Sequence, residues 1–187
     1  MSDSPSSRPA LIVVDVQVGF DDPQWGARDN PDCEVNVLAL LASWREAGDP
    51  VVLVRHDSAT EGSPLLPGAA GNALKPGVDG AHDLFVSKNT NSAFYGTPDL
   101  HAWLQERGIG NVVICGIQTN KCCETTARMA GNLGYDTTFV LDATHTFDAV
   151  DLDGAVIPAA ELARVTAANL HGEFATVRST AEVLAGR

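Results

Sequence analysis

The segment Asn111–Gly134, NVVICGIQTNKCCETTARMAGNLG, contains the pattern on which the fold depends. It opens with the near-continuous apolar run Asn111–Cys115 and passes through a glycine-bearing turn into a helical stretch, Asn120–Leu133, followed by a glycine. A short apolar run of this kind is typical of a strand covered on both faces, as in a parallel sheet. The segment therefore predicts one strand–turn–helix unit of an α/β protein.

The same alternation recurs on both sides of this segment. Further apolar, β-branched runs predict strands at 10–14, 51–54 and 136–141, with weaker candidates at 84–86 and 174–177. Helices are expected at 33–47, 99–107, 159–170 and 180–184. In the first of these helices apolar residues recur at helical spacing, and Gly48 follows where a C-terminal capping glycine belongs. The alternation predicts one α/β domain, a mostly parallel sheet with helices on both faces.

Composition narrows the class of protein. The chain has 187 residues, of which 44% are hydrophobic and 19% charged, and its formal net charge is −12. These values exclude a disordered, collagenous or coiled-coil protein. An acidic surface repels phosphate backbones and anionic lipids, so we expect neither nucleic acid nor a membrane as partner. The charge says nothing about a small neutral or cationic molecule, and a small-molecule substrate is what we expect.

The cysteines and the first residues indicate a location. Four cysteines, two of them adjacent, do not make a disulfide framework in a chain of this length, which favours a reducing compartment. Residues 1–9 are polar and predict a disordered leader before a domain over 10–187, and no apolar run reaches the ~20 residues of a membrane helix. We therefore expect a cytoplasmic protein.

Two long loops, 17–32 and 58–81, follow the first two predicted strands and are expected to be functional. In open α/β sheets, ligands bind beyond the carboxyl ends of the strands. The residues at these ends are Asp15, His56, Asp57, Lys88, the segment 116–122 and His145. A carboxylate, an ammonium group and a thiol are therefore expected at one edge of the sheet.

Cys122 is the candidate nucleophile of this group. It follows Thr119 and Asn120, both good N-capping residues, in the first turn of a predicted helix. The helix dipole, the unpaired N–H groups and a nearby Lys88 are expected to lower the pKa of its thiol, and Asp15 could carry the proton. The alternative is a small apolar residue packed under the sheet.

Helical geometry separates Cys122 from its neighbour. Successive helical residues point ~100° apart, so both thiols cannot face one site. Cys123 lies on the stripe of small residues that packs onto the sheet, and Cys122 points away from it. Cys115 lies inside a predicted strand and Cys33 begins a helix, so both are expected to be structural.

Three segments resemble one family. They are Leu11–Phe20 (LIVVDVQVGF), Ser87–Thr97 (SKNTNSAFYGT) and Gly116–Thr126 (GIQTNKCCETT). In this order and spacing they resemble the isochorismatase-like cysteine hydrolases over residues ~10–177. The resemblance implies a three-layer, Rossmann-type α/β/α domain with a six-stranded sheet. It also implies a homo-oligomer, either a dimer or a tetramer.

The same resemblance assigns the expected site residues. It implies a catalytic triad of Asp15, Lys88 and Cys122 and a cis peptide bond between Ile117 and Gln118. The oxyanion hole would consist of the backbone N–H groups of Gln118 and Cys122. Such a site hydrolyses a C–N bond (amide, carbamoyl or ureido) through a thioester. Two alternatives stay open: a vinyl-ether hydrolase that uses Asp15 as the acid, and a non-catalytic redox or binding module with a vicinal thiol pair.

The resemblance also bears on cofactors and on the pocket. Nicotinamidases of the family bind a metal through histidines after the second strand, but Ala59 stands at the first of these positions, so we expect no metal and no cofactor. The candidate pocket residues are Phe20, Trp25, His56, Phe94 and Tyr95. Ordinary packing is an alternative for each aromatic residue, and a structural hydrogen bond is the favoured role of His56.

Overall fold

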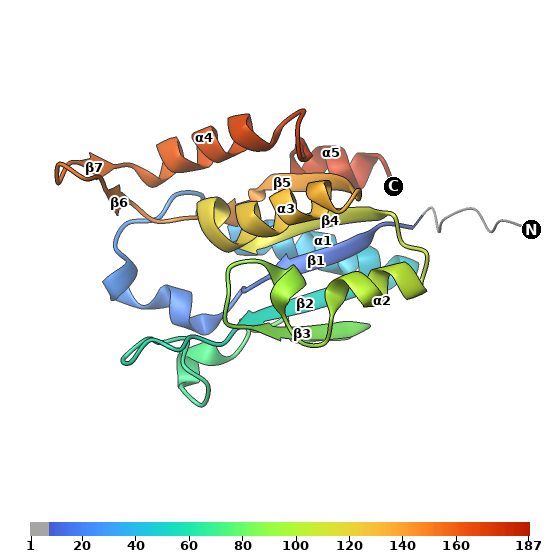
Figure 1. Ribbon diagram of the computed structural model, residues 1–187, viewed down its shortest axis with the longest axis horizontal. Helices are drawn as coiled ribbons and strands as arrows, with labels where there is room; N and C mark the ends of the chain where they lie inside the picture. Colours follow the sequence, from blue (N-terminus) through green and yellow to red (C-terminus); the bar gives the residue numbers. More distant parts are fainter. Residues whose placement is uncertain (1–7) are drawn as a thin grey trace, which may run out of the picture.

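The computed structural model describes residues 8–187, and its centre is a six-stranded sheet in the order β3-β2-β1-β4-β5-β8 (Figure 1). All neighbouring strands in this sheet are parallel. The strands are β1 (Ala10–Val14), β2 (Val51–His56), β3 (Leu84–Lys88), β4 (Asn111–Ile117), β5 (Asp136–His145) and β8 (Thr176–Arg178). Of the predicted leader 1–9, residues 1–7 lie outside the described part of the chain.

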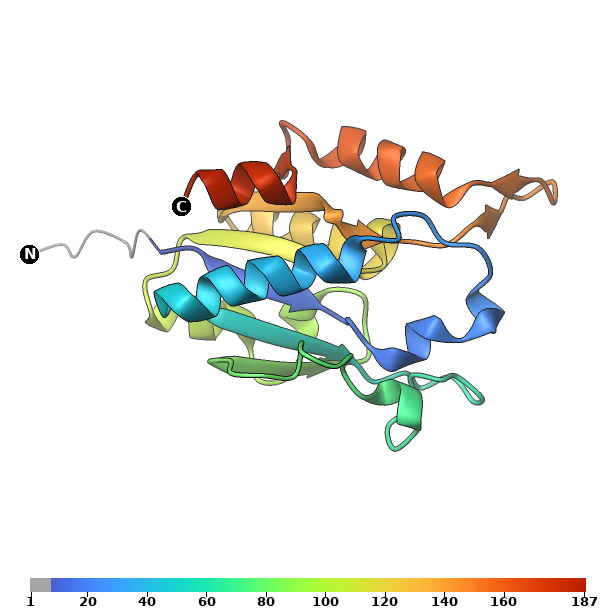
Figure 2. The ribbon, with the colours of Figure 1, turned by 180° about the vertical axis from the view of Figure 1, so that it is seen from behind.

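Helices cover both faces of the sheet, as Figures 1 and 2 show from opposite sides. One face carries α1 (Cys33–Ala47) and α5 (Thr180–Ala185), and the other carries α2 (Leu100–Glu106), α3 (Glu124–Asn132) and α4 (Ala159–Leu170). Side chains of β1 alternate between the two cores: Ile12 packs on the α2–α3 side and Leu11 on the α1 side. This arrangement confirms the predicted three-layer α/β/α domain.

Several predicted boundaries agree with the structure, and others were too short. The helices over 33–47 and 159–170 match residue for residue, and Gly48 adopts the left-handed conformation with φ 67°. β1 also has its predicted bounds, and Asp15 follows it as expected. Strands β2, β3, β4 and β5, in contrast, run further at their carboxyl ends, because pairing continues between His56 and Lys88 and between Ile117 and His145. His56, Lys88 and His145, which were expected just past strands, are therefore the last residues within them. The weak strand predicted at 174–177 lies at Thr176–Arg178.

The loops contain short elements that the sequence patterns did not reveal. Four turns are 3-10 helices: η1 (Val18–Asp21), η2 (Pro23–Trp25), η3 (Ala70–Asn72) and η4 (Ala93–Tyr95). Strands β6 (Ala149–Val150) and β7 (Val156–Ile157) form an antiparallel hairpin before α4. Figures 1 and 2 show this hairpin at the opposite end of the molecule from α5 and from the start of β1.

The predicted helix Asn120–Leu133 begins differently from the expectation. Its first turn, η5 (Thr119–Cys123), is π-helical and leads directly into α3. Before it, Gly116 has φ 129°, and a Cβ atom there would lie 2.0 Å from the carbonyl oxygen of Val14. Only glycine allows β4 to approach β1 so closely at the point where β1 ends. No helix among the described residues combines the length and apolar character needed to cross a membrane.

Candidate active site

Asp15 follows β1 and is held in an uncommon backbone conformation. Its φ is 53°, and its amide donates a hydrogen bond to the carbonyl of Val54 at 2.9 Å. Its side chain is fully buried. A non-glycine residue with positive φ is uncommon and persists where the surrounding structure over-determines it, which occurs often at functional sites.

Lys88 ends β3 and forms a buried ion pair with Asp15. Its Nζ donates a hydrogen bond to Asp15 Oδ2 at 2.5 Å, and both side chains are fully buried. Burial raises the pKa of Asp15, although the ammonium of Lys88 acts in the opposite direction. Burial also opposes the charge of Lys88, but the Asp15 carboxylate raises the lysine pKa above its ordinary value. We therefore describe the pair as a carboxylate and an ammonium.

Cys122 lies in η5 and faces this pair. Its Sγ, a carboxylate oxygen of Asp15 and a ring nitrogen of His56 all lie within 4.8 Å of one another. Sγ also lies 3.9 Å from Oδ1 of Asn91, in the loop after β3. Asn91 was not a predicted site residue, because an exposed asparagine in a loop carries no periodic signal. Cys123 is fully buried in the core.

The pKa of the Cys122 thiol corrects one expectation. Burial and the charge of Asp15 raise it to about 12, although Lys88 lowers it. The prediction of a lowered pKa was wrong because it considered the helix terminus and Lys88 but not desolvation. Cys122 is therefore a thiol at neutral pH, and its activation requires a base at the moment of attack.

The turn between β4 and α3 leads into η5, which carries Cys122. The peptide bond between Ile117 and Gln118 is cis, and Gln118 precedes η5 without a side-chain capping bond. Side chains from β5 and the residue after it support this turn: Thr119 Oγ1 donates to Thr144 Oγ1 at 2.8 Å, and Thr146 Oγ1 donates to Asn120 Oδ1 at 2.5 Å. These bonds hold the turn against the edge of the sheet.

The candidate pocket residues of the first long loop lie on one side of this site. Trp25 packs against Phe20 and Phe147, with ring centroids 5.2 and 5.7 Å away. Trp25 and His56 together line a cavity of about 310 Å³, closed by residues of the loop 58–65. Phe20 is buried behind Trp25 and is not among the residues that line the cavity.

The other candidates lie elsewhere. Phe94 stacks on Tyr135 and packs against the core below α2 and α3, and Tyr95 is exposed to solvent. His145 ends β5 but is buried beside Glu34, with 3.8 Å between His145 Nε2 and Glu34 Oε1. His145 is not in the group of potential ligands around Cys122 Sγ within residues 8–187, whereas Phe94 packs against the core cluster that contains Cys122.

The residues around Cys122 do not fit a resident metal. Asp15, His56 and Cys122 are the one group of three potential ligands brought together within residues 8–187. However, Lys88 Nζ lies 2.5 Å from Asp15 Oδ2 and 3.3 Å from His56 Nδ1. An ammonium that already lies between two ligand atoms opposes a second cation there.

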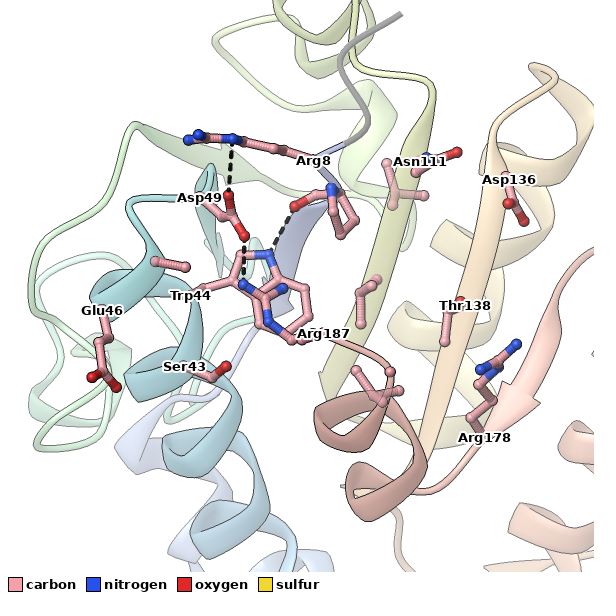
Figure 3. Close-up of a pocket in the computed structure, with 16 residues that line it drawn as sticks. Arg8, Ser43, Trp44, Glu46, Asp49, Asn111, Asp136, Thr138, Arg178 and Arg187 are labelled. Atoms are coloured by element: carbon pink, nitrogen blue, oxygen red, sulfur yellow. Dashed lines mark hydrogen bonds and ion pairs between the residues drawn. The ribbon is translucent and has the colours of Figure 1, made fainter.

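Another cavity lies at the opposite, amino edge of the sheet (Figure 3). It has a volume of about 660 Å³, and its lining includes Trp44, Asn111 and Asp136. Arg8 and Arg187 both pair with Asp49, and the Arg187 guanidinium lies 3.4 Å from the centre of the Trp44 ring. None of the described residues that line this cavity is a cysteine, whereas the candidate nucleophile Cys122 lies at the carboxyl edge of the sheet.

Known proteins are similar to this chain in fold and in sequence. A family model described as Isochorismatase domain matches residues 9–181. The chain is 40% identical over 176 residues to the Bacillus subtilis isochorismatase family protein YrdC, with 94% of each chain covered. It is 35% identical over 153 residues to Nicotinamidase 3 of Arabidopsis thaliana, with 74% of each covered. A crystal structure from Chromobacterium violaceum, described as an isochorismatase-family hydrolase, has a TM-score of 0.91 at 39% identity and covers 99% of this chain and 97% of that chain.

Proposed function

Because this chain belongs to the isochorismatase family of hydrolases, we propose that it cleaves a C–N bond of a small molecule through a thioester on Cys122. The substrate class is an amide, a carbamoyl compound or a ureido compound. Asp15 is the proton carrier, Lys88 holds the carboxylate charged, and the backbone N–H groups of Gln118 and Cys122 receive the oxyanion.

One observation carries this proposal: a thiol, a carboxylate and an ammonium meet in a buried cluster. The carboxylate of Asp15 lies within 4.8 Å of Cys122 Sγ and is paired with Lys88. Because the thiol has a raised pKa, it needs a base close by, and a buried carboxylate with a raised pKa is a stronger base than an exposed one. The two shifts therefore suit proton transfer from Cys122 to Asp15.

The steps follow from this arrangement. Sγ attacks the substrate carbonyl carbon while Asp15 takes the thiol proton, and the carbonyl oxygen becomes an oxyanion beside the N–H groups of Gln118 and Cys122. Asp15 then gives the proton to the nitrogen as the C–N bond breaks, which leaves a thioester. Water attacks the thioester, Asp15 accepts a water proton, and Sγ leaves and takes this proton back.

The substrate itself is open within this class. Ala59 and the ammonium of Lys88 both favour metal-independent hydrolysis, unlike a metal-dependent nicotinamidase. We also propose that a small molecule is the sole kind of substrate and that the protein is a homo-oligomer. The domain limits 10–187 and the cytoplasmic location stay predictions.

A screen for ammonia release over amides, carbamoyl compounds and ureido compounds tests the proposal. We expect at least one compound to be turned over by the natural protein but not by Cys122→Ala. The matched control is Cys123→Ala, in which a neighbouring buried thiol is lost and turnover persists. If Cys122→Ala releases ammonia as fast as the natural protein, the thioester on Cys122 is excluded. If the natural protein releases ammonia from none of these compounds, the vinyl-ether reaction with Asp15 as acid becomes the better explanation.

A further inference from the structure

His56 makes a contact that the proposed mechanism leaves unused. Its Nδ1 lies 3.3 Å from Nζ of Lys88, on the neighbouring strand, where His56 and Lys88 are partners in the register of β2 and β3. An ammonium carries three N–H donors and no acceptor. Nδ1 therefore accepts this hydrogen bond with its lone pair, and any hydrogen of the neutral ring is on Nε2.

We propose that His56 is a positioning residue, whose Nδ1 holds the Lys88 ammonium in the place where it faces both Asp15 and Cys122. The inference rests on the proposed function and extends it to a residue outside the triad. Lys88 is almost fully buried, and its ammonium interacts with both Asp15 and Cys122. A lysine has four side-chain torsions, so several directional partners are needed to fix its terminal nitrogen.

The charges around His56 favour the neutral ring that this role requires. Burial and the ammonium of Lys88 lower the pKa of His56, whereas the carboxylates of Asp15 and Asp57 and the backbone of Thr90 act in the opposite direction. The ring is therefore neutral near pH 7, and its Nδ1 lone pair is directed at Lys88. Because this lone pair is occupied, His56 is not the base that removes the thiol proton.

The backbone of His56 is fixed by a second set of hydrogen bonds. Gln17 Nε2 donates to the His56 carbonyl at 3.0 Å, and the His56 amide donates to Gln17 Oε1 at 2.9 Å. Asn72 Nδ2 donates to the same carbonyl at 3.1 Å. Gln17 is fully buried and lies two residues after Asp15, so the positions of His56 and Asp15 depend on one short segment. Support of this kind keeps a site within the geometry that its chemistry needs.

The position of the ammonium can be measured through Cys122 by alkylation, without a substrate. Iodoacetate is negatively charged and iodoacetamide is neutral, yet both react with the same thiol and are similar in size. The ratio of their rate constants at Cys122, followed by mass spectrometry at fixed pH and salt, reports the positive charge beside Sγ. The fraction of Cys122 present as thiolate and the accessibility of Sγ affect the rate constants of both reagents. These two factors therefore largely cancel from the ratio.

His56→Leu removes the acceptor, and we expect the ratio to fall by roughly threefold or more, toward the value of Lys88→Met. His56→Asn places an amide oxygen near the position of Nδ1, and we expect it to restore at least half of the loss. Thermal unfolding of each variant identifies those that do not fold. Comparison of His56→Asn with His56→Leu separates the effect of losing a hydrogen-bond acceptor from the effect of a smaller side chain.

Three results would overturn the inference. They are an unchanged ratio in His56→Leu, an equal fall in His56→Leu and His56→Asn, and a ratio in Lys88→Met equal to that of the natural protein. The first two contradict the role of His56 and leave the thioester mechanism intact. If neither reagent alkylates Cys122 in the natural protein, the proposed function fails, and the role of His56 fails with it.

Discussion

Two carboxylates near the carboxyl edge of the sheet both face basic side chains, yet their pKa values move in opposite directions. Burial opposes the charge of Glu34, but hydrogen bonds from Arg28 and Lys75 lower its pKa to about 2. For Asp15, burial outweighs the single ammonium of Lys88, and the pKa is raised. An ion pair between an acid and a base therefore gives Glu34 a carboxylate that resists protonation and gives Asp15 a carboxylate that accepts a proton more readily.

Burial and the number of donors together explain the difference: the side chain of Asp15 is fully buried, whereas that of Glu34 is 23% exposed. Arg28 donates to both oxygens of Glu34 at 2.8 Å, and Lys75 adds a third bond at 2.7 Å. Asp15 receives one bond from Lys88, and its Oδ1 is buried with no hydrogen-bond partner among the described residues. Because Arg28 and Lys75 come from the two long loops, the Glu34 cluster fastens these loops to α1. The unsatisfied oxygen of Asp15 is available to a proton instead.

The largest expected effect separates the two clusters by activity. Asp15→Asn keeps the size of the side chain but cannot accept the thiol proton, and we expect hydrolysis to fall about 10³-fold. Glu34→Gln changes the other carboxylate in the same way and is the matched control, with activity lowered by less than about threefold where the protein is folded. Steady-state kcat/KM measures both. Equal losses of kcat/KM in the two variants would show that Asp15 has no greater role in catalysis than Glu34.

A substitution at Gly116 should displace the end of β1, and with it Asp15, while leaving the contacts of Glu34 unchanged. In Gly116→Ala the new Cβ meets the Val14 carbonyl, so β1 and β4 must separate, and we expect unfolding to become easier by about 3 kcal/mol. Gly110→Ala is the control, because nothing lies within 4 Å of a Cβ there. Denaturant unfolding measures both, and similar stabilities would contradict the close approach of the two strands.

Loss of Glu34 should lower stability more than activity. Glu34→Gln leaves the half-buried Arg28 and the buried Lys75 without their shared carboxylate, and we expect the free energy of unfolding to fall by about 2 kcal/mol. The same denaturant experiment measures this value. A variant as stable as the natural protein would mean that the cluster does not hold the loops to α1.

Acidification should affect the two clusters in sequence, and this is the smallest expected effect. The pKa of Asp15 is raised, so kcat/KM should decline on acidification while the pH is still above 3.8, the ordinary value. The pKa of Glu34 is lowered, so its stabilisation is complete above 4.5 and is lost as the pH falls toward about 2. Activity and unfolding measured over the same pH range should therefore decline in that order. The reverse order would contradict the assignment.

Much of the fold could be predicted because its signals are local. The apolar periodicity of Cys33–Ala47 and the capping glycine after it depend only on neighbouring residues, and the structure confirms this helix. Strands β2, β3, β4 and β5 were predicted to end too early, because pairing partners such as His56 and Lys88 extend them. The π-helical turn and the β6–β7 hairpin had no periodic signal either.

The sequence by itself determined the alternation of strands and helices and the residue types at the strand ends, since both depend on short-range patterns. It also identified Asp15, Lys88 and Cys122 as candidates. Only the tertiary structure decided their ionisation: Lys88 and Asp15 are 73 residues apart in the chain but 2.5 Å apart in space. Desolvation and distance set the pKa values of Cys122 and Asp15, and neither quantity exists until the strands have packed.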